Sequence, residues 1–227
     1  MVNEMTQANR LAWWALILAL VILPIEGPFA AERPETYVGF YGGVTIPQSF
    51  KDVHGVGELS DIKLTDLDLA RSAIYGAKLG MFLPGRERWL GVETEFFYTN
   101  PHIKQQDIGF TVSGVPAGTF NFAGAHVRVA TWAVNWILRY PGERFQPYIG
   151  VGPGIFWGRM SGVELGTGSD TSLGLNALAG ARFFFTKRLA LFGEFKYNRV
   201  SFDFGGTASI HALYQPYHFV GGLSLHF

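Results

Sequence analysis

Apolar and polar residues alternate with a period of two along most of the chain beyond residue 36. In one such stretch Leu90 and Phe96 share a face, whereas Glu93 and Glu95 share the other. A helix, with its period of 3.6 residues, would mix these two sets, so the alternation favours strands. The same pattern predicts eight strands along the chain. They cover residues 37–46, 71–83, 89–99, 126–140, 145–158, 172–185, 189–202 and 215–227.

The lengths of these strands and of the links between them indicate a membrane barrel. A tilted strand needs about 9–11 residues to cross a bilayer, whereas strands in soluble sheets average about 5–6 residues. Long and short links alternate, as the short periplasmic turns and long extracellular loops of outer-membrane barrels do. The long links cover 47–70, 100–125, 159–171 and 203–214, and the short ones cover 84–88, 141–144 and 186–188. We predict an all-β fold, an eight-stranded antiparallel up-and-down transmembrane β-barrel.

The N-terminal segment has the order of regions found in a secretory signal peptide. A polar start containing Arg10 precedes an unbroken apolar run over residues 11–23, and small residues Ala30 and Ala31 follow. As a helix this run rises only about 20 Å, short of the roughly 30 Å hydrocarbon core of a bilayer. We therefore predict a signal peptide over residues 1–31, export from the cytoplasm, and a barrel domain over residues 32–227.

Glycine is unusually abundant, and its positions favour one face of the predicted strands. The chain holds 29 Gly in 227 residues, close to twice the usual share of about 7%. The interior of an eight-stranded barrel is just wide enough for side chains, so glycine leaves room there for large polar residues. Periodicity alone does not separate this arrangement from a soluble sheet with its faces reversed, but residue size favours the barrel. We predict an interior charge network of Lys78, Glu93, Glu95, Arg139, Arg182, Glu194 and Lys196.

Composition and spacing argue against several other functions. The 18 Lys+Arg balance the 18 Asp+Glu without a long basic run, so we predict no nucleic-acid partner. The absence of Cys excludes disulfides and thiolate metal sites. The Gly-x-Gly-x-Gly segment at 150–154 lies within a predicted strand and is not followed by a helix, so we predict no bound cofactor. The acidic residues of 47–70 do not have EF-hand spacing, and we predict no metal site.

The end of the chain carries the resemblance to a known family. One face of the last predicted strand carries Phe219, Leu223, Leu225 and Phe227. This pattern resembles the C-terminal β-signal of bacterial outer-membrane proteins, and the segment QPYIGVGPG at 146–154 is similar to the fifth-strand region of the OmpA/OmpX-like superfamily of small outer-membrane barrels. The resemblance covers about residues 37–227. It implies a monomer in the cell outer membrane that contacts outer-membrane lipid and lipopolysaccharide and is recognised by the barrel-assembly machinery.

Candidate catalytic groups are few. His218, Ser224 and His226 share a face of the last strand, and Ser224 with either His could form a nucleophile pair, as in outer-membrane lipid A deacylases. The His-x-Ser-Asn run of that family is absent, however, and the sequence assigns no acidic orienter. We therefore predict no catalytic residue.

The function that these observations favour is non-enzymatic. We predict an integral outer-membrane barrel that is structural or surface-binding through four extracellular loops, with a filled polar interior. The alternatives are a lipid-A-modifying enzyme built on the same barrel and a narrow channel.

Overall fold

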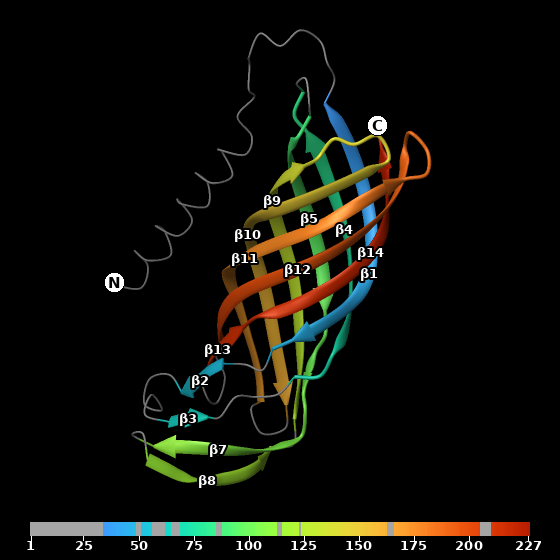
Figure 1. The fold of residues 1–227 in the computed structure, drawn as a ribbon. Helices are drawn as coiled ribbons and strands as arrows, with labels where there is room; N and C mark the ends of the chain where they lie inside the picture. Colours follow the sequence, from blue (N-terminus) through green and yellow to red (C-terminus); the bar gives the residue numbers. More distant parts are fainter. Residues whose placement is uncertain are drawn as a thin grey trace, which may run out of the picture. The chain divides into compact units, whose positions relative to one another are not determined.

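Eight long antiparallel strands close into a barrel (Figure 1). The strands are β1 (Glu35–Pro47), β4 (Ser72–Phe82), β5 (Leu90–Thr99), β9 (Ala125–Arg139), β10 (Phe145–Gly162), β11 (Gly166–Phe184), β12 (Leu189–Phe204) and β14 (Pro216–His226). Each pairs with the next along the chain, and β14 returns to β1. The predicted fold class is confirmed, and each predicted strand corresponds to one strand of the barrel.

The computed structural model describes most of the chain beyond the predicted signal peptide. The described residues are 34–48, 51–55, 62–64, 69–84, 88–112, 115–122, 124–162, 166–204 and 210–227. The predicted signal peptide over residues 1–31 lies outside them. No helix in this part of the chain is long and apolar enough to cross a bilayer.

The strand register fixes the tilt of the barrel wall. Each strand is offset from its neighbour, and one circuit of paired residues that starts at Glu35 returns to β1 at Thr45, a shear of ten residues. The circuit runs through Glu35, Phe82, Gly91, Ile137, Gly150, Leu178, Lys196, His218 and Thr45. Such a stagger requires strands that tilt against the barrel axis, typically by about 35–45°.

A band of large apolar side chains covers the outside of the barrel. Phe40 on β1, Leu79 on β4 and Trp136 on β9 are all more than half exposed, and every barrel strand contributes large apolar side chains that are at least 38% exposed. Soluble monomers rarely expose contiguous apolar patches above a few hundred Å². The apolar faces therefore point toward lipid and the polar faces point inward, which rules out the reversed arrangement of a soluble sheet.

Exposed aromatic residues lie near both edges of this band. Trp89 and Phe145 lie at the turn end, and Trp157 and the half-buried Tyr98 lie toward the other end. Phe145 and Trp157 are twelve residues apart on β10, which corresponds to roughly 30 Å along the axis at a tilt of about 40°. This height is close to the apolar band of about 25 Å expected for a transmembrane barrel with aromatic girdles.

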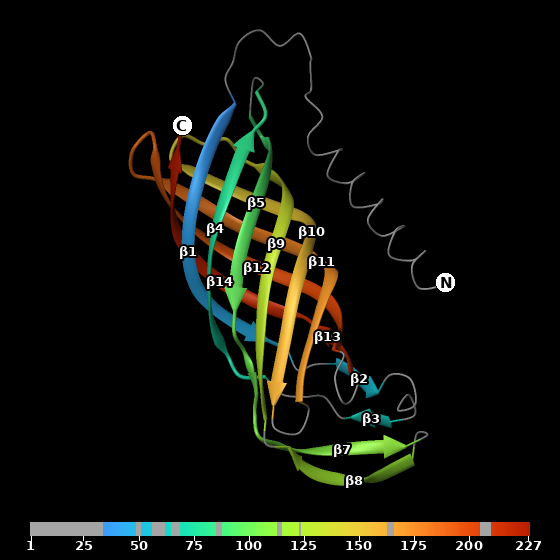
Figure 2. The same ribbon diagram turned by 180° about the vertical axis from the view of Figure 1, so that it is seen from behind.

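The two ends of the barrel differ in their connections. At one end the links are short, and backbone bonds such as that from the Phe185 N–H to the Leu189 carbonyl (3.0 Å) close them. The Phe227 N–H donates to the Thr36 carbonyl (2.8 Å) at the same end. Figures 1 and 2 show that end beside the C-terminus, with the short strands β2, β3, β7 and β8 at the opposite end. We call these the turn end and the loop end.

The barrel wall continues into a sheet extension at the loop end. β13 (Ile210–Tyr214) pairs with the last residues of β12, and β2 (Lys51–Gly55) pairs with β13. The hairpin of β7 (Gln106–Val112) and β8 (Val115–Phe122) joins this sheet through β3 (Ile62–Leu64). A two-residue strand, β6 (His102–Ile103), pairs with the start of β9. The order of the sheet extension is β13-β2-β3-β7-β8.

Two of the predicted long links are wrong. Residues 159–162 and 166–169 belong to β10 and β11 and pair with each other, from Arg159 with Ser169 to Gly162 with Gly166. In the predicted link 203–214, residues 203–204 likewise belong to β12 and residues 210–214 to β13, and Phe204 pairs with Ile210. Residues 159–162 and 166–169 resemble loops in sequence because they are rich in Gly, Ser and Thr.

The polarity of the two faces reverses toward the loop end. On β12 the polar inward residues Glu194, Lys196 and Asn198 lie in the membrane part, and the inward residues beyond them are Val200, Phe202 and Phe204. The outward residues change in the opposite sense. An apolar cluster therefore fills the loop end of the barrel. It comprises Leu69, Ile103, Ala125, Val127, Val129, Phe156, Met160, Val200, Phe202, Phe204, Ala212 and Tyr214. The change of the outer face from apolar to polar marks where the barrel leaves the lipid, because a lipid-facing surface is apolar and a surface in water is polar.

Candidate functional site

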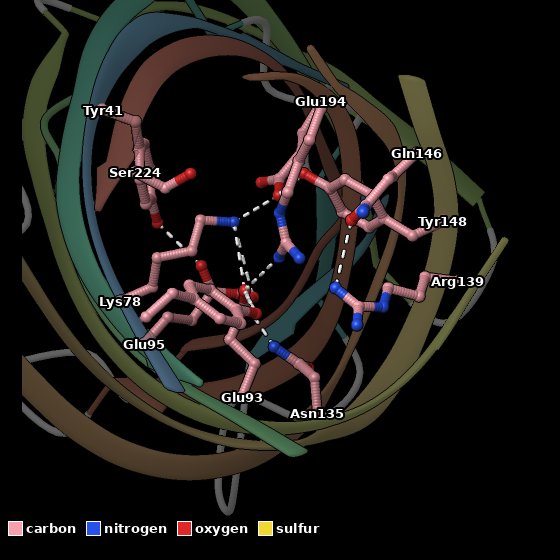
Figure 3. A network of polar contacts seen from close by, with 12 residues as sticks. Tyr41, Lys78, Glu93, Glu95, Asn135, Arg139, Gln146, Tyr148, Glu194 and Ser224 are labelled. Carbon is pink, nitrogen blue, oxygen red and sulfur yellow. Dashed lines mark hydrogen bonds and ion pairs between the residues drawn. The ribbon is translucent and has the colours of Figure 1, made fainter. Parts of the chain in front are cut away.

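Six charged side chains meet at the centre of the barrel interior, and Figure 3 labels Lys78, Glu93, Glu95 and Glu194 among them. They come from four strands and are at most 5% exposed. The six are Lys78, Glu93, Glu95, Arg182, Glu194 and Lys196. We call them the central charge network. Three cations face three carboxylates, so the network is neutral when all are ionised, which limits the cost of burying charge.

Glu194 joins the two lysines. The Lys78 ammonium donates a hydrogen bond to Glu194 and lies 3.3 Å from a carboxylate oxygen of Glu93. The Lys196 ammonium donates to Glu95 and lies 3.3 Å from the other oxygen of Glu194. Each lysine thus contacts two carboxylates. Removal of either lysine would leave buried carboxylates without a counter-charge.

A tyrosine hydroxyl caps each of the three carboxylates. Tyr41 donates to Glu95 (2.8 Å), and Tyr37 and Tyr148 donate to Glu93 and Glu194. These tyrosines are not among the predicted interior residues. The signal for them is their parity, because each stands on the same strand face as the inner glycines, as Tyr37 and Tyr41 do beside Gly39 and Gly43. Donors from three sides keep the carboxylates hydrogen-bonded away from water.

The inner glycines make room for these rings. A Cβ atom built at Gly80 would lie 2.3 Å from the Tyr37 ring, and one at Gly76 would lie 2.7 Å from the Tyr41 ring. Both distances are far below van der Waals contact. The excess of glycine therefore has the spatial role that the composition suggested.

Arg182 is held by aromatic faces more than by hydrogen bonds. Its guanidinium carbon lies 4.1 Å from the Tyr37 ring centroid and 4.5 Å from that of Tyr148. One terminal nitrogen lies 3.5 Å from a Glu93 oxygen, and none of its three nitrogens has a hydrogen-bond partner in the described part of the chain. Cation–π contact and the nearby carboxylate are the interactions that stabilise this buried cation.

A chain of amides connects the network to the loop end. Asn135 and Asn176 both donate to the same oxygen of Glu95, at 3.0 and 2.7 Å. Asn198 donates to Asn176 (2.7 Å), and His218 Nε2 lies 2.7 Å from the Asn198 carbonyl oxygen. Because that oxygen can only accept, Nε2 carries the proton, and His218 Nδ1 accepts from the Thr45 hydroxyl at 2.9 Å. The interior is thus filled by side chains between its centre and the apolar cluster.

Arg139 belongs to a second group at the turn end. It lies apart from the six central charges and forms a two-pronged ion pair with Glu35, with one N···O distance of 2.8 Å. It also donates to the Gln146 side chain (3.0 Å) and the Arg88 carbonyl (2.9 Å). The structure therefore places all seven charged residues of the predicted interior network inside the barrel but divides them into two groups, and it adds Glu35, which is not among the predicted residues.

Glu35 also supplies an acidic partner for a histidine. His226 Nδ1 lies 3.0 Å from a Glu35 oxygen, and Nε2 lies 3.0 Å from the Ser224 hydroxyl. The carboxylate can only accept, so Nδ1 carries the proton and Nε2 accepts from Ser224. This is the order of a serine hydrolase relay. Ser224 is only 2% exposed, however, and its strand neighbour His226 is 3% exposed. His218, by contrast, does not contact Ser224 and belongs to the amide chain.

The residues of the predicted C-terminal signal lie on the outside of the barrel. Phe219, Leu223, Leu225 and Phe227 are each 40–68% exposed on the lipid-facing side. β14 pairs with both β12 and β1, so this strand closes the barrel. The four residues contribute to the apolar band and take no part in the interior network.

The described residues offer no evident metal site. No group of three or more His, Asp or Glu side chains among them is placed to hold a metal ion. Of the acidic residues in 47–70, Glu58, Asp61, Asp66 and Asp68 lie outside the described residues.

Comparison with known proteins agrees with this architecture. Neisserial surface protein A superposes with a TM-score of 0.53 and 15% identity, covering 85% of this chain and 97% of that chain. The attachment invasion locus protein Ail of Yersinia pestis, in complex with the heparin analogue sucrose octasulfate, gives a TM-score of 0.50, 13% identity, and coverage of 86% and 100%. The outer-membrane protease OmpT of Escherichia coli superposes with a TM-score of 0.50 and 10% identity, covering 87% of this chain and 99% of that chain. At these identities the likeness shows the fold alone.

Family membership rests on the sequence match. None of the curated protein sequences matches the chain. The model of the outer membrane protein beta-barrel domain, in contrast, matches residues 15–227, which is nearly the whole chain. The predicted resemblance to small outer-membrane barrels is confirmed, and the chain belongs to the outer membrane protein beta-barrel domain family.

Proposed function

We propose that this outer-membrane barrel is non-enzymatic and acts as a structural or surface-binding protein through its loop end. The observation that carries the proposal is the filled interior. The central charge network, the amide chain and the apolar cluster of the loop end follow one another along the lumen. A lumen packed in this way leaves little space for substrate or for a continuous column of water.

The narrow-channel alternative is tested by conductance. We expect the folded chain to be silent in planar lipid bilayers, because ions would have to displace paired charges that are at most 5% exposed. Folding of the inserted sample is verified by the shift in gel mobility on boiling. Steady single-channel currents from folded protein would contradict the proposal, whereas silence supports a closed lumen.

The sheet extension is the surface that we propose for binding. β8 pairs only with β7 among the described strands, so its other side is a free sheet edge. Free edges offer unpaired backbone groups to an extended segment of a partner. Replacing residues 106–122 by a short Gly-Ser turn should abolish surface contacts of cells that carry the chain while the barrel still folds. Unchanged adhesion of such cells would argue against this surface.

A second candidate function rests on the relay of Ser224, His226 and Glu35. If the relay is catalytic, the chain should react with a fluorophosphonate probe, and lipid A from cells with and without the gene should differ in mass. We expect neither result, because Ser224 is only 2% exposed and lies at the turn end, away from the outer leaflet. Labelling that is lost in Ser224→Ala would establish the enzyme instead.

The remaining partners follow from the same proposal. The signal peptide would direct export, the barrel-assembly machinery would insert the chain, and the protein would work as a monomer in contact with outer-membrane lipid and lipopolysaccharide. No nucleic-acid partner is proposed. The even charge balance of 18 against 18 is consistent with this set, because it gives no strong field toward polyanions in solution.

A further inference from the structure

Two arginines lie side by side on the outer face at the loop end. Arg128 on β9 and Arg159 on β10 are direct cross-strand partners, and both are exposed. Directly opposite residues of an antiparallel pair have Cβ atoms only about 4.5–5.5 Å apart. Their positive charges are therefore held close together by the backbone register itself.

This pair has no anionic partner within the described part of the chain. No ion pair or side-chain hydrogen bond joins either arginine to a described carboxylate. Like charges directly opposite each other destabilise a sheet. Two adjacent guanidinium groups without a carboxylate suit an anionic ligand chemically, since each presents several N–H donors in a planar fork that matches phosphate.

The depth of the pair identifies where the anion would come from. Trp157 precedes Arg159 by two residues on the same face, and its ring lies 6.5 Å from that of Phe96 in the apolar band. Two residues on a tilted strand add only about 5 Å along the axis. Trp side chains favour the membrane interface, so the arginines lie just outside the hydrocarbon, at the level of lipid headgroups.

We propose that Arg128 and Arg159 bind the headgroup phosphate of an anionic lipid in the outer leaflet. The two guanidinium groups would bind the phosphate from the side while Trp157 and Phe96 contact the acyl part below it. The proposal rests on the lipid contact of the proposed function and assigns two residues to it. The site does not include the sheet extension, so failure of lipid binding and failure of surface binding are separate results.

The test compares lipids that differ only in phosphate. The full chain is purified folded in a neutral detergent and titrated with diphosphoryl lipid A or with its dephosphorylated form, and bound lipid is counted by native mass spectrometry. Two arginines at a membrane surface correspond to a gain of about 30-fold in affinity. We expect this preference for the phosphorylated lipid in the unaltered chain and its loss in the double variant Arg128→Gln, Arg159→Gln.

Arg199 provides the matched control. It lies two residues beyond Tyr197 on the outer face of β12, is exposed, and is opposite Leu175, so it is a single arginine at a similar position relative to the aromatic girdle. Arg199→Gln should keep the preference within about twofold of the unaltered chain. Gel mobility before and after boiling verifies that each variant is folded.

Three results would overturn the proposal. The first is an equal loss in Arg199→Gln and the double variant, which would indicate general surface charge. The second is equal binding of both lipid forms by the unaltered chain. The third is full competition by inorganic phosphate at concentrations equal to the lipid, which would mean that the pair binds the free anion and not the headgroup.

Discussion

At the scale of residues, each of the three carboxylates in the central charge network contacts at least one buried cation and accepts a hydrogen bond from a tyrosine hydroxyl. Glu194 illustrates this, because it receives Tyr148 and contacts both Lys78 and Lys196. A buried carboxylate with these partners is satisfied, whereas one that lost a partner would retain its desolvation cost. The stability of the barrel should therefore be most sensitive to substitutions that break the balance of charge.

Lys196→Met tests this sensitivity. The substitution removes the cation between Glu95 and Glu194, and we expect a loss of about 3–5 kcal/mol in the free energy of unfolding. Urea unfolding of the refolded barrel, followed by Trp fluorescence, measures it. Combining Lys196→Met with Glu95→Leu should recover part of the loss, because the unpaired charge is removed. Lys187→Gln in the exposed turn is the control, and a loss of equal size there would argue against the role of the network.

The same scale shows which parts of the site could be predicted. Charged residues such as Lys78 and Glu95 stand out in sequence, because charge at a period of two among apolar residues marks the polar face of a strand. Glu35 and the tyrosine caps do not stand out. Glu35 precedes the alternating stretch, and a tyrosine fits either a lipid interface or an interior, so only the three-dimensional register shows which carboxylate it faces.

At the scale of elements, several strands extend beyond the membrane, and the sequence pattern predicts only part of these extensions. The alternation of β12 continues through Phe202 and Phe204, but the apolar residues change from the outer face to the inner one. A period of two indicates that a strand continues, but it does not identify which face of the strand contacts lipid. The loop-end parts of β10 and β11 were missed for a related reason, since their outer faces carry Ser and Thr where the membrane part carries Leu and Phe.

The position of this reversal predicts a boundary of accessibility on β12. The chain has no Cys, so single cysteines can be introduced at outward positions of one strand. We expect Ser201→Cys to react with a membrane-impermeant maleimide on intact cells, and Leu191→Cys and Phe195→Cys to remain unreactive because lipid covers them. Labelling after solubilisation and unfolding confirms that each cysteine is present. Reaction at Phe195→Cys on intact cells would contradict this boundary and the position of the apolar band.

At the scale of the whole molecule, the barrel is closed by its first and last strands. β14 bonds with β1 over eleven residue pairs and with β12 on its other side, so no sheet edge remains in the membrane part of the wall. Closure matters because an unpaired backbone group in lipid costs several kcal/mol. Closure brings strands from opposite ends of the chain together, and the assembly of such nonlocal pairs is slow without help.

Substitution of Phe227 tests whether its ring acts in assembly of the barrel or in its stability. Its side chain is 68% exposed, while its backbone bonds with Thr36 on β1, so the ring contributes little to packing in the finished barrel. If this ring serves as part of an assembly signal, Phe227→Ala should lower the fraction of folded, heat-modifiable protein in cell envelopes several-fold, yet change the unfolding free energy of the refolded protein by less than about 1 kcal/mol. Phe183→Ala, which truncates an exposed lipid-facing ring on β11, is the control and should leave assembly in cells unchanged. An equal assembly defect in both variants would assign the effect to loss of lipid-facing area. A large loss of unfolding free energy in Phe227→Ala but not in Phe183→Ala would instead show that the ring stabilises the closed barrel. A residue that acts only as an assembly signal would leave the stability of the refolded barrel unchanged.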